Sequence, residues 1–109
     1  MAFVALDVAM EVVEHLGAVV ERIEQRDRSL GDQVRRVASS VALNLAEGAK
    51  RTGKDRIHLF RIAHGSAAEV KTALRLAVAW RYVSASALEP SLVSLDRLGG
   101  LLHGLTRPR

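Results

Sequence analysis

Polar side chains of four different kinds stand at helical spacing in the middle of the chain. They are separated by four, four and three residues, so an α-helix would align them in one stripe. A guanidinium, a hydroxyl, an amide and a carboxylate in register can satisfy one another's hydrogen bonds where a helix is covered, so we interpret them as an ordered network inside an assembly. This polar seam consists of Arg36, Ser40, Asn44 and Glu47, with Ser66 and Glu69 from the next helical segment.

The two carboxylates of the polar seam raise the question of catalysis. Glu47 and Glu69 side by side would hold a metal ion or share a proton. Arg36 in the same stripe would neutralise them, and no histidine falls in that stripe. A structural network is therefore the favoured interpretation, and we expect no catalytic residue, no metal ligand and no cofactor.

Other combinations of ligands or nucleophiles are weak. The chain has no cysteine, which excludes disulfides, thiolate zinc sites and cysteine nucleophiles. His58 and His64 are six residues apart, so they project to different sides of a helix. Glu11 and His15 have acceptable spacing, but two ligands alone do not make a zinc site. We expect the protein not to be an enzyme.

Basic side chains gather along the third helical segment and the loop before it. Repeated cations at helical spacing can follow a phosphate backbone, with binding that depends on salt and reads little sequence. A solvated basic face, or pairing with the acidic first helix of another subunit, explains the same pattern without nucleic acid. The predicted nucleic-acid-binding residues are Arg35, Lys50, Arg51, Lys54, Arg56, Arg61, His64, Lys71 and Arg75.

The formal net charge of +4 hides an uneven distribution. Residues 3–28 carry six anions against three cations, and the rest of the chain carries thirteen cations against six anions. Thirteen of the sixteen cations are arginine, whose planar guanidinium suits bidentate pairing with carboxylate or phosphate. This polarity favours an anionic partner, and it would also let identical subunits dock acidic side to basic side.

Apolar residues repeat at helical spacing in four segments, without an alternating strand pattern of useful length. At 109 residues, 49% of them hydrophobic, the chain fits a single domain. Ser29 with Asp32 predicts a capping box for the second helix, and Pro90 suits the first turn of the fourth. Gly99 and Gly100 would let that last helix pack closely on a neighbour. We predict an all-α domain over 1–109, with helices at about 3–26, 30–48, 54–82 and 88–105.

The third helix carries more apolar surface than one bundle core needs. A second apolar face lies a quarter turn or more from the core-forming side, and its exposure would mark an association surface. We infer a homo-oligomer, although the first and fourth helices of a monomeric bundle would also cover both sides. The predicted oligomer interface consists of Ile62, Ala73, Leu76 and Trp80.

The order of the polar residues resembles a known family. The pattern Gln-x-Arg-Arg-x-x-x-Ser-x-x-x-Asn-x-Ala-Glu-Gly over residues 33–48, followed by Gly-Ser-x-x-Glu over residues 65–69, is similar to the small bacterial four-helix bundle proteins of 23S rRNA intervening sequences. That family includes Avd, the accessory protein of diversity-generating retroelements. Members often carry proline two residues after the serine, where this chain has Ala42, a difference that should straighten the helix without removing the fold.

The resemblance implies an antiparallel up-down four-helix bundle that assembles into a ring, as a homopentamer. It also implies a non-enzymatic scaffold that binds RNA or DNA and, in a retroelement, a reverse transcriptase. A protein–protein interaction module with no nucleic-acid role is the alternative. We read no signal peptide, because the apolar start is short, lacks a basic leader and is interrupted by Asp7. A cytoplasmic bacterial protein without a membrane partner is expected.

Overall fold

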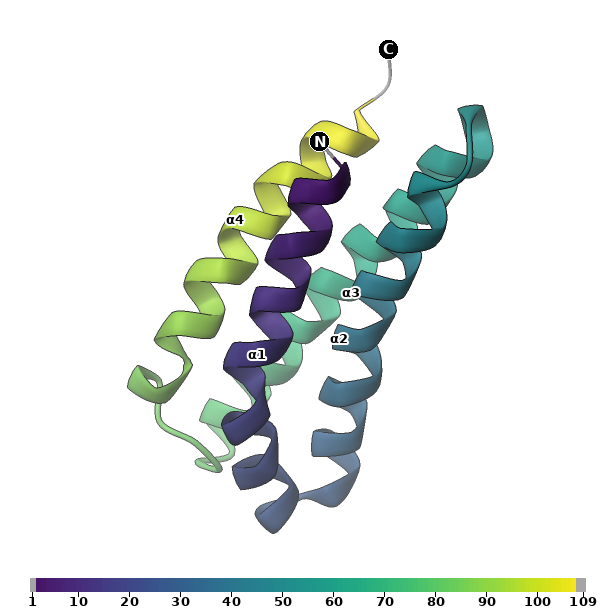
Figure 1. The fold of residues 1–109 in the computed structure, drawn as a ribbon. Helices are drawn as coiled ribbons and strands as arrows, with labels where there is room; N and C mark the ends of the chain where they lie inside the picture. The colour runs from purple at the N-terminus through teal and green to yellow at the C-terminus, as the bar shows by residue number, and fades with distance from the viewer. Residues whose placement is uncertain (1, 108–109) are drawn as a thin grey trace.

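The computed structural model describes residues 2–107, with side chains from residue 4 onward. It consists of four α-helices and one short 3-10 turn (Figure 1). No strand occurs in residues 2–107, so the predicted all-α class with four helices is confirmed. Within the same residues, no helix is long and apolar enough to cross a membrane. The elements are α1 (Ala2–Arg26), α2 (Arg28–Ala49), α3 (Gly53–Ala79), η1 (Ser86–Leu88) and α4 (Glu89–Thr106).

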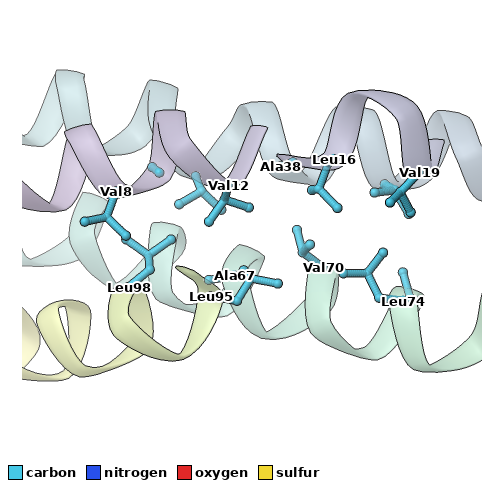
Figure 2. Packing of buried hydrophobic residues seen from close by; sticks show 14 of the residues in the cluster. Val8, Val12, Leu16, Val19, Ala38, Ala67, Val70, Leu74, Leu95 and Leu98 are labelled. Atoms are coloured by element: carbon cyan, nitrogen blue, oxygen red, sulfur yellow. The ribbon is translucent and has the colours of Figure 1, made fainter. Parts of the chain in front are cut away.

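The helices lie side by side around an apolar core in a molecule of 42 × 22 × 20 Å. Both α1 and α3 pack against α2 and α4. Figure 2 shows Val12 and Leu16 of α1 lying across the core from Val70 of α3, with Leu95 of α4 nearby. None of these four side chains is more than 4% exposed. Burying a large aliphatic side chain contributes about 1.5–3 kcal/mol, so the core that all four helices share is the main stabilising feature of the fold.

A single non-helical residue, Asp27, joins α1 to α2. Its backbone is extended, with φ −153° and ψ 94°, and its Oδ1 accepts a hydrogen bond of 2.9 Å from the Leu30 N–H. Asp27 is therefore the N-cap of α2. The predicted capping box at Ser29 and Asp32 is wrong, because the chain reverses two residues earlier and Ser29 already lies within α2.

The other carboxylate oxygen of Asp27 connects this turn to the end of α3. The Tyr82 hydroxyl donates to Asp27 Oδ2 at 3.1 Å. Burial, and after it this hydrogen bond, raises the pKa of Tyr82 above its ordinary value of 10.0. Because the unfolded chain then ionises at lower pH than the folded one, the contribution of Tyr82 to stability is fully present below pH 10.0 and is lost as the pH rises through the folded pKa.

We expect the difference in stability between this protein and Tyr82→Phe to stay constant below pH 10.0 and to shrink above it. Denaturant unfolding of the two proteins at matched pH values measures that difference. An ultraviolet absorbance titration gives the pKa directly, since the chain has one tyrosine. A native pKa at or below 10.0 would contradict the prediction.

The end of α3 is set by a left-handed residue, Arg81, whose φ is 64°. The Tyr82 N–H donates to the Ala77 oxygen and the Arg81 N–H to the Val78 oxygen, both at 2.9 Å. This pair of bonds is the Schellman pattern that closes a helix. The predicted helix end near residue 82 lies beyond the observed end at Ala79. The prediction missed this end because Arg81 occupies the left-handed position, where glycine is the usual residue.

Replacing Arg81 by glycine should raise the free energy of unfolding by about 1 kcal/mol, because glycine adopts a positive φ without the Cβ clash that other residues suffer. Arg81→Ala is the matched control: it removes the same charge and keeps the Cβ. Denaturant unfolding compares the three proteins. Equal stability of the glycine and alanine variants would show that the left-handed conformation carries no cost.

The turn before α4 is held by Ser84, whose Oγ accepts a hydrogen bond of 3.2 Å from the Ala87 N–H. The regular helix begins at Glu89, with Pro90 in its first turn. Proline is tolerated there because the first N–H groups of a helix have no intrahelical acceptor.

Close approach between helices occurs at two glycines of α2. A Cβ at Gly31 would overlap Glu24 Cγ of α1, and a Cβ at Gly48 would lie 2.6 Å from the Phe60 ring of α3. The corresponding positions at Gly99 and Gly100 open onto free space. The expectation that these two glycines let α4 pack closely is therefore wrong for one copy of the chain.

Candidate assembly and nucleic-acid surfaces

The centre of the polar seam is a hydrogen-bonded contact between α2 and α3. Ser40 Oγ and Ser66 Oγ lie 3.2 Å apart. Asn44 Nδ2 donates to the Ser40 carbonyl oxygen at 2.8 Å and to Ser40 Oγ at 3.1 Å. The four-residue spacing in α2 puts Ser40 and Asn44 on adjacent turns, so the structure brings these three predicted residues together.

The charged members of the polar seam have other environments. Arg36 Nη2 donates to Gln33 Oε1 at 2.7 Å, an exposed bond within α2. Glu47 Oε1 accepts from Arg51 Nη2 at 2.9 Å, and this arginine lowers the pKa of Glu47 through the hydrogen bond and then through its charge. Glu69 is exposed on α3 and has no ion pair among residues 4–107. Within the same residues, no three histidine, aspartate or glutamate side chains gather so that they could hold a metal ion.

Three of the four predicted interface residues leave large apolar side chains in solvent. The exposed fraction is 39% for Ile62, 46% for Leu76 and 66% for Trp80, whereas Ala73 is 7% exposed and belongs to the core. Leu43 of α2, which sequence reasoning missed, is 69% exposed and lines a hollow with Ser40 and Asn44. Its position off the buried stripe of α2 could have identified it. We call Leu43, Ile62, Leu76 and Trp80 the apolar face.

Three of the predicted nucleic-acid-binding cations are held by carboxylates of the same chain. Surface pairs of this kind are worth about 0–1 kcal/mol each, but they offset the charge that a phosphate would meet. One of the three cations, Lys71, pairs with a carboxylate of α4, so the structure does not gather all of the predicted residues in one stripe. The pairs are Arg35 with Glu24 at 2.7 Å, Arg51 with Glu47 at 2.9 Å and Lys71 with Asp96 at 2.7 Å.

Two more of the predicted residues contact other parts of the bundle. The Arg56 guanidinium carbon lies 5.3 Å from the centroid of the Phe60 ring, within the range of a cation–π contact. His64 lines a hollow of about 290 Å³ between α3 and α4, together with Lys71 and Leu95. Neither side chain belongs to the most open surface of α3.

The other predicted cations of α3 form a row along its outer side. Lys54, Arg61 and Arg75 follow one another at seven and fourteen residues, so they lie on nearly the same side of the helix, about 10 Å and about 21 Å apart. All three are exposed and have no ion pair among residues 4–107. We call Lys54, Arg61 and Arg75 the basic row. Lys50, in the loop before α3, is also exposed.

Comparison with known proteins gives the chain its family. A crystal structure of a protein of unknown function from the S23 ribosomal protein family of Bacteroides thetaiotaomicron matches with a TM-score of 0.84, over 95% of this chain and 99% of that chain. At 18% sequence identity, this likeness shows the fold alone. No curated protein matches the sequence. A family model for the 23S rRNA-intervening sequence protein matches residues 3–104, so the chain belongs to the 23S rRNA-intervening sequence protein family.

Proposed function

We propose that this protein is a non-enzymatic scaffold of several copies that binds RNA or DNA in the cytoplasm. The copies would be antiparallel up-down bundles arranged in a ring, for which the family resemblance implies a pentamer. Contacts between α2 and α3 support the antiparallel order. Ser40 meets Ser66, and the earlier Leu30 and Gln33 share a hollow with the later Ala73.

The basic row is the observation that carries the nucleic-acid proposal. Its three cations are exposed, aligned and unpaired within the described chain, whereas Arg35, Arg51 and Lys71 already contact carboxylates. Contacts between such cations and phosphates release counterions, so affinity would fall steeply as salt rises. Assembly would repeat the row in each copy and let one long nucleic acid contact several of them.

The apolar face supports assembly. Trp80 and Leu76 stand one turn apart on α3, and both are largely in solvent in a single copy. Exposed aromatic and aliphatic side chains grouped in this way are typical of association surfaces. Covering them with another copy would remove the indole from water, which tryptophan fluorescence reports.

Charge reversal in the basic row tests nucleic-acid binding. We expect Arg61→Glu with Arg75→Glu to weaken binding of labelled RNA or DNA by at least about 10-fold at low salt, because favourable phosphate contacts become repulsive. Fluorescence anisotropy at two salt concentrations measures the affinity. Light scattering checks that the assembly keeps its mass.

The matched control is Arg22→Glu with Arg97→Glu, which changes the net charge equally on exposed positions of α1 and α4. We expect this control to bind within about 3-fold of the unmodified protein. Equal weakening of binding by both double variants would mean that the net charge of the protein, and not the position of the basic row, determines the affinity for nucleic acid. Failure of the unmodified protein to bind at low salt would overturn the proposal.

A reverse transcriptase is the proposed protein partner if the chain acts as Avd does in a diversity-generating retroelement. The family resemblance is what supports this role. A reverse-transcriptase gene beside the gene for this protein, followed by co-purification of the two products, is the expected result. A gene neighbourhood without such an enzyme would favour a scaffold outside retroelements.

An interaction module without a nucleic-acid role is the second candidate. The observation in its favour is that cations on this surface already pair with carboxylates, as in Arg35 with Glu24 and Lys71 with Asp96. An unlabelled acidic polypeptide added to the anisotropy titration separates the two candidates. Tighter binding of the polypeptide than of RNA or DNA would favour the interaction module.

A further inference from the structure

Two charged residues of the polar seam, Arg36 and Glu69, have no ion-pair partner among residues 4–107 of a single copy. Arg36 is exposed. Its guanidinium donates a hydrogen bond to the neutral Gln33 side chain and not to Asp32, which lies one turn earlier on α2. Glu69 is exposed on α3, and no cation lies three or four residues from it in either direction. Its own helix therefore offers no neutralising partner.

These two charges lie beside the apolar face. Arg36 is one turn before Ser40, and Glu69 is about one turn after Ser66. Because α2 and α3 run in opposite directions in the proposed bundle, both residues lie toward the same end of the bundle from the Ser40–Ser66 contact. Glu69 lines a hollow of about 590 Å³ with Leu76, and Arg36 lines one of about 760 Å³ with Leu43. This side of the bundle thus presents one cation, one anion and exposed apolar side chains together.

We infer that a second copy of this chain covers this side of the bundle, and that Arg36 of one copy pairs with Glu69 of another. The inference rests on the self-assembly part of the proposed function. An interface that buries Leu76 and Trp80 would also desolvate the nearby charges, and a buried charge without a partner is strongly unfavourable. Arginine and carboxylate can meet through two parallel hydrogen bonds, which fixes how the copies are oriented.

Single charge reversals test this pairing. Arg36→Glu and Glu69→Arg should each reduce the mass seen by light scattering to that of one copy at concentrations where the unmodified protein is assembled, because every interface then opposes like charges. Both positions are exposed, so circular dichroism should show unchanged helix content. Arg22→Glu, an exposed reversal on α1, should leave the mass unchanged.

Mixing the two single variants separates pairing between copies from pairing within one copy. In an equimolar mixture, the glutamate introduced at position 36 can meet the arginine introduced at position 69 of the other variant, and the original Arg36 and Glu69 can meet as well. Species of more than one copy should therefore return in the mixture, although a closed ring of five copies would keep at least one interface between two copies of the same variant. A bond within one copy would not be restored by mixing.

The outcomes distinguish this inference from the proposed function. Single variants that keep the assembled mass, or a mixture that stays dissociated, would overturn the Arg36–Glu69 pairing while self-assembly stands. An unmodified protein that has the mass of one copy would overturn self-assembly itself, and the pairing with it.

Discussion

Replacing Gly48 by alanine should lower the free energy of unfolding, although alanine is the better helix former. The added Cβ would lie 2.6 Å and 2.8 Å from two carbons of the Phe60 ring and 3.3 Å from Leu59 Cβ. Phe60 is 1% exposed and belongs to the apolar core, so moving its ring would disturb the side chains packed around it. Overpacking of this kind costs about 1–3 kcal/mol, against a gain of about 1 kcal/mol in helix propensity.

Gly17→Ala is the matched control for Gly48→Ala. Gly17 lies within α1, and nothing is within 4 Å of the position that its Cβ would take. This variant should gain about 1 kcal/mol from helix propensity alone. Denaturant unfolding at one fixed protein concentration gives both values, and their difference isolates the crowding at Phe60. Equal gains in stability at the two positions would contradict the close approach between α2 and α3.

The number and type of the helices could be predicted because apolar residues repeat at helical spacing over long segments. The positions of the turns depended on single residues, and there prediction failed. Asp27 caps α2 with its own carboxylate, although Ser29 and Asp32 offer a better-known capping pattern two residues later. Arg81 ends α3 in a conformation that glycine usually occupies, so no residue type marked that end.

The candidate site was predictable to the extent that it depended on one helix. Helical spacing placed Ile62, Leu76 and Trp80 on a face that the structure leaves exposed. Contacts between helices could not be predicted from helical spacing, because they depend on how α2, α3 and α4 pack against one another. Lys71 aligns with other cations in the sequence, yet its amine meets Asp96, twenty-five residues away on α4.

Removing the Asp27 carboxylate should cost about 2 kcal/mol of stability, because one side chain holds two elements. Asp27→Ala loses the N-cap bond to Leu30, worth about 1 kcal/mol at a typical helix start. It also leaves the half-buried Tyr82 hydroxyl without its acceptor. Losing a hydrogen-bond partner in this way costs about 1 kcal/mol more.

Asp32→Ala is the control that separates the two possible caps of α2. The Asp32 side chain is exposed and makes no hydrogen bond or ion pair within residues 4–107, so its loss should change stability by no more than about 0.5 kcal/mol. A cycle of Asp27→Ala, Tyr82→Phe and the double variant measures the coupling between the turns. If Asp27 acts only as a cap, the single effects will add. If the double variant loses less stability than the sum of the two single losses, the Asp27 carboxylate and the Tyr82 hydroxyl are coupled. That result would show that the same carboxylate connects the end of α3 to the start of α2.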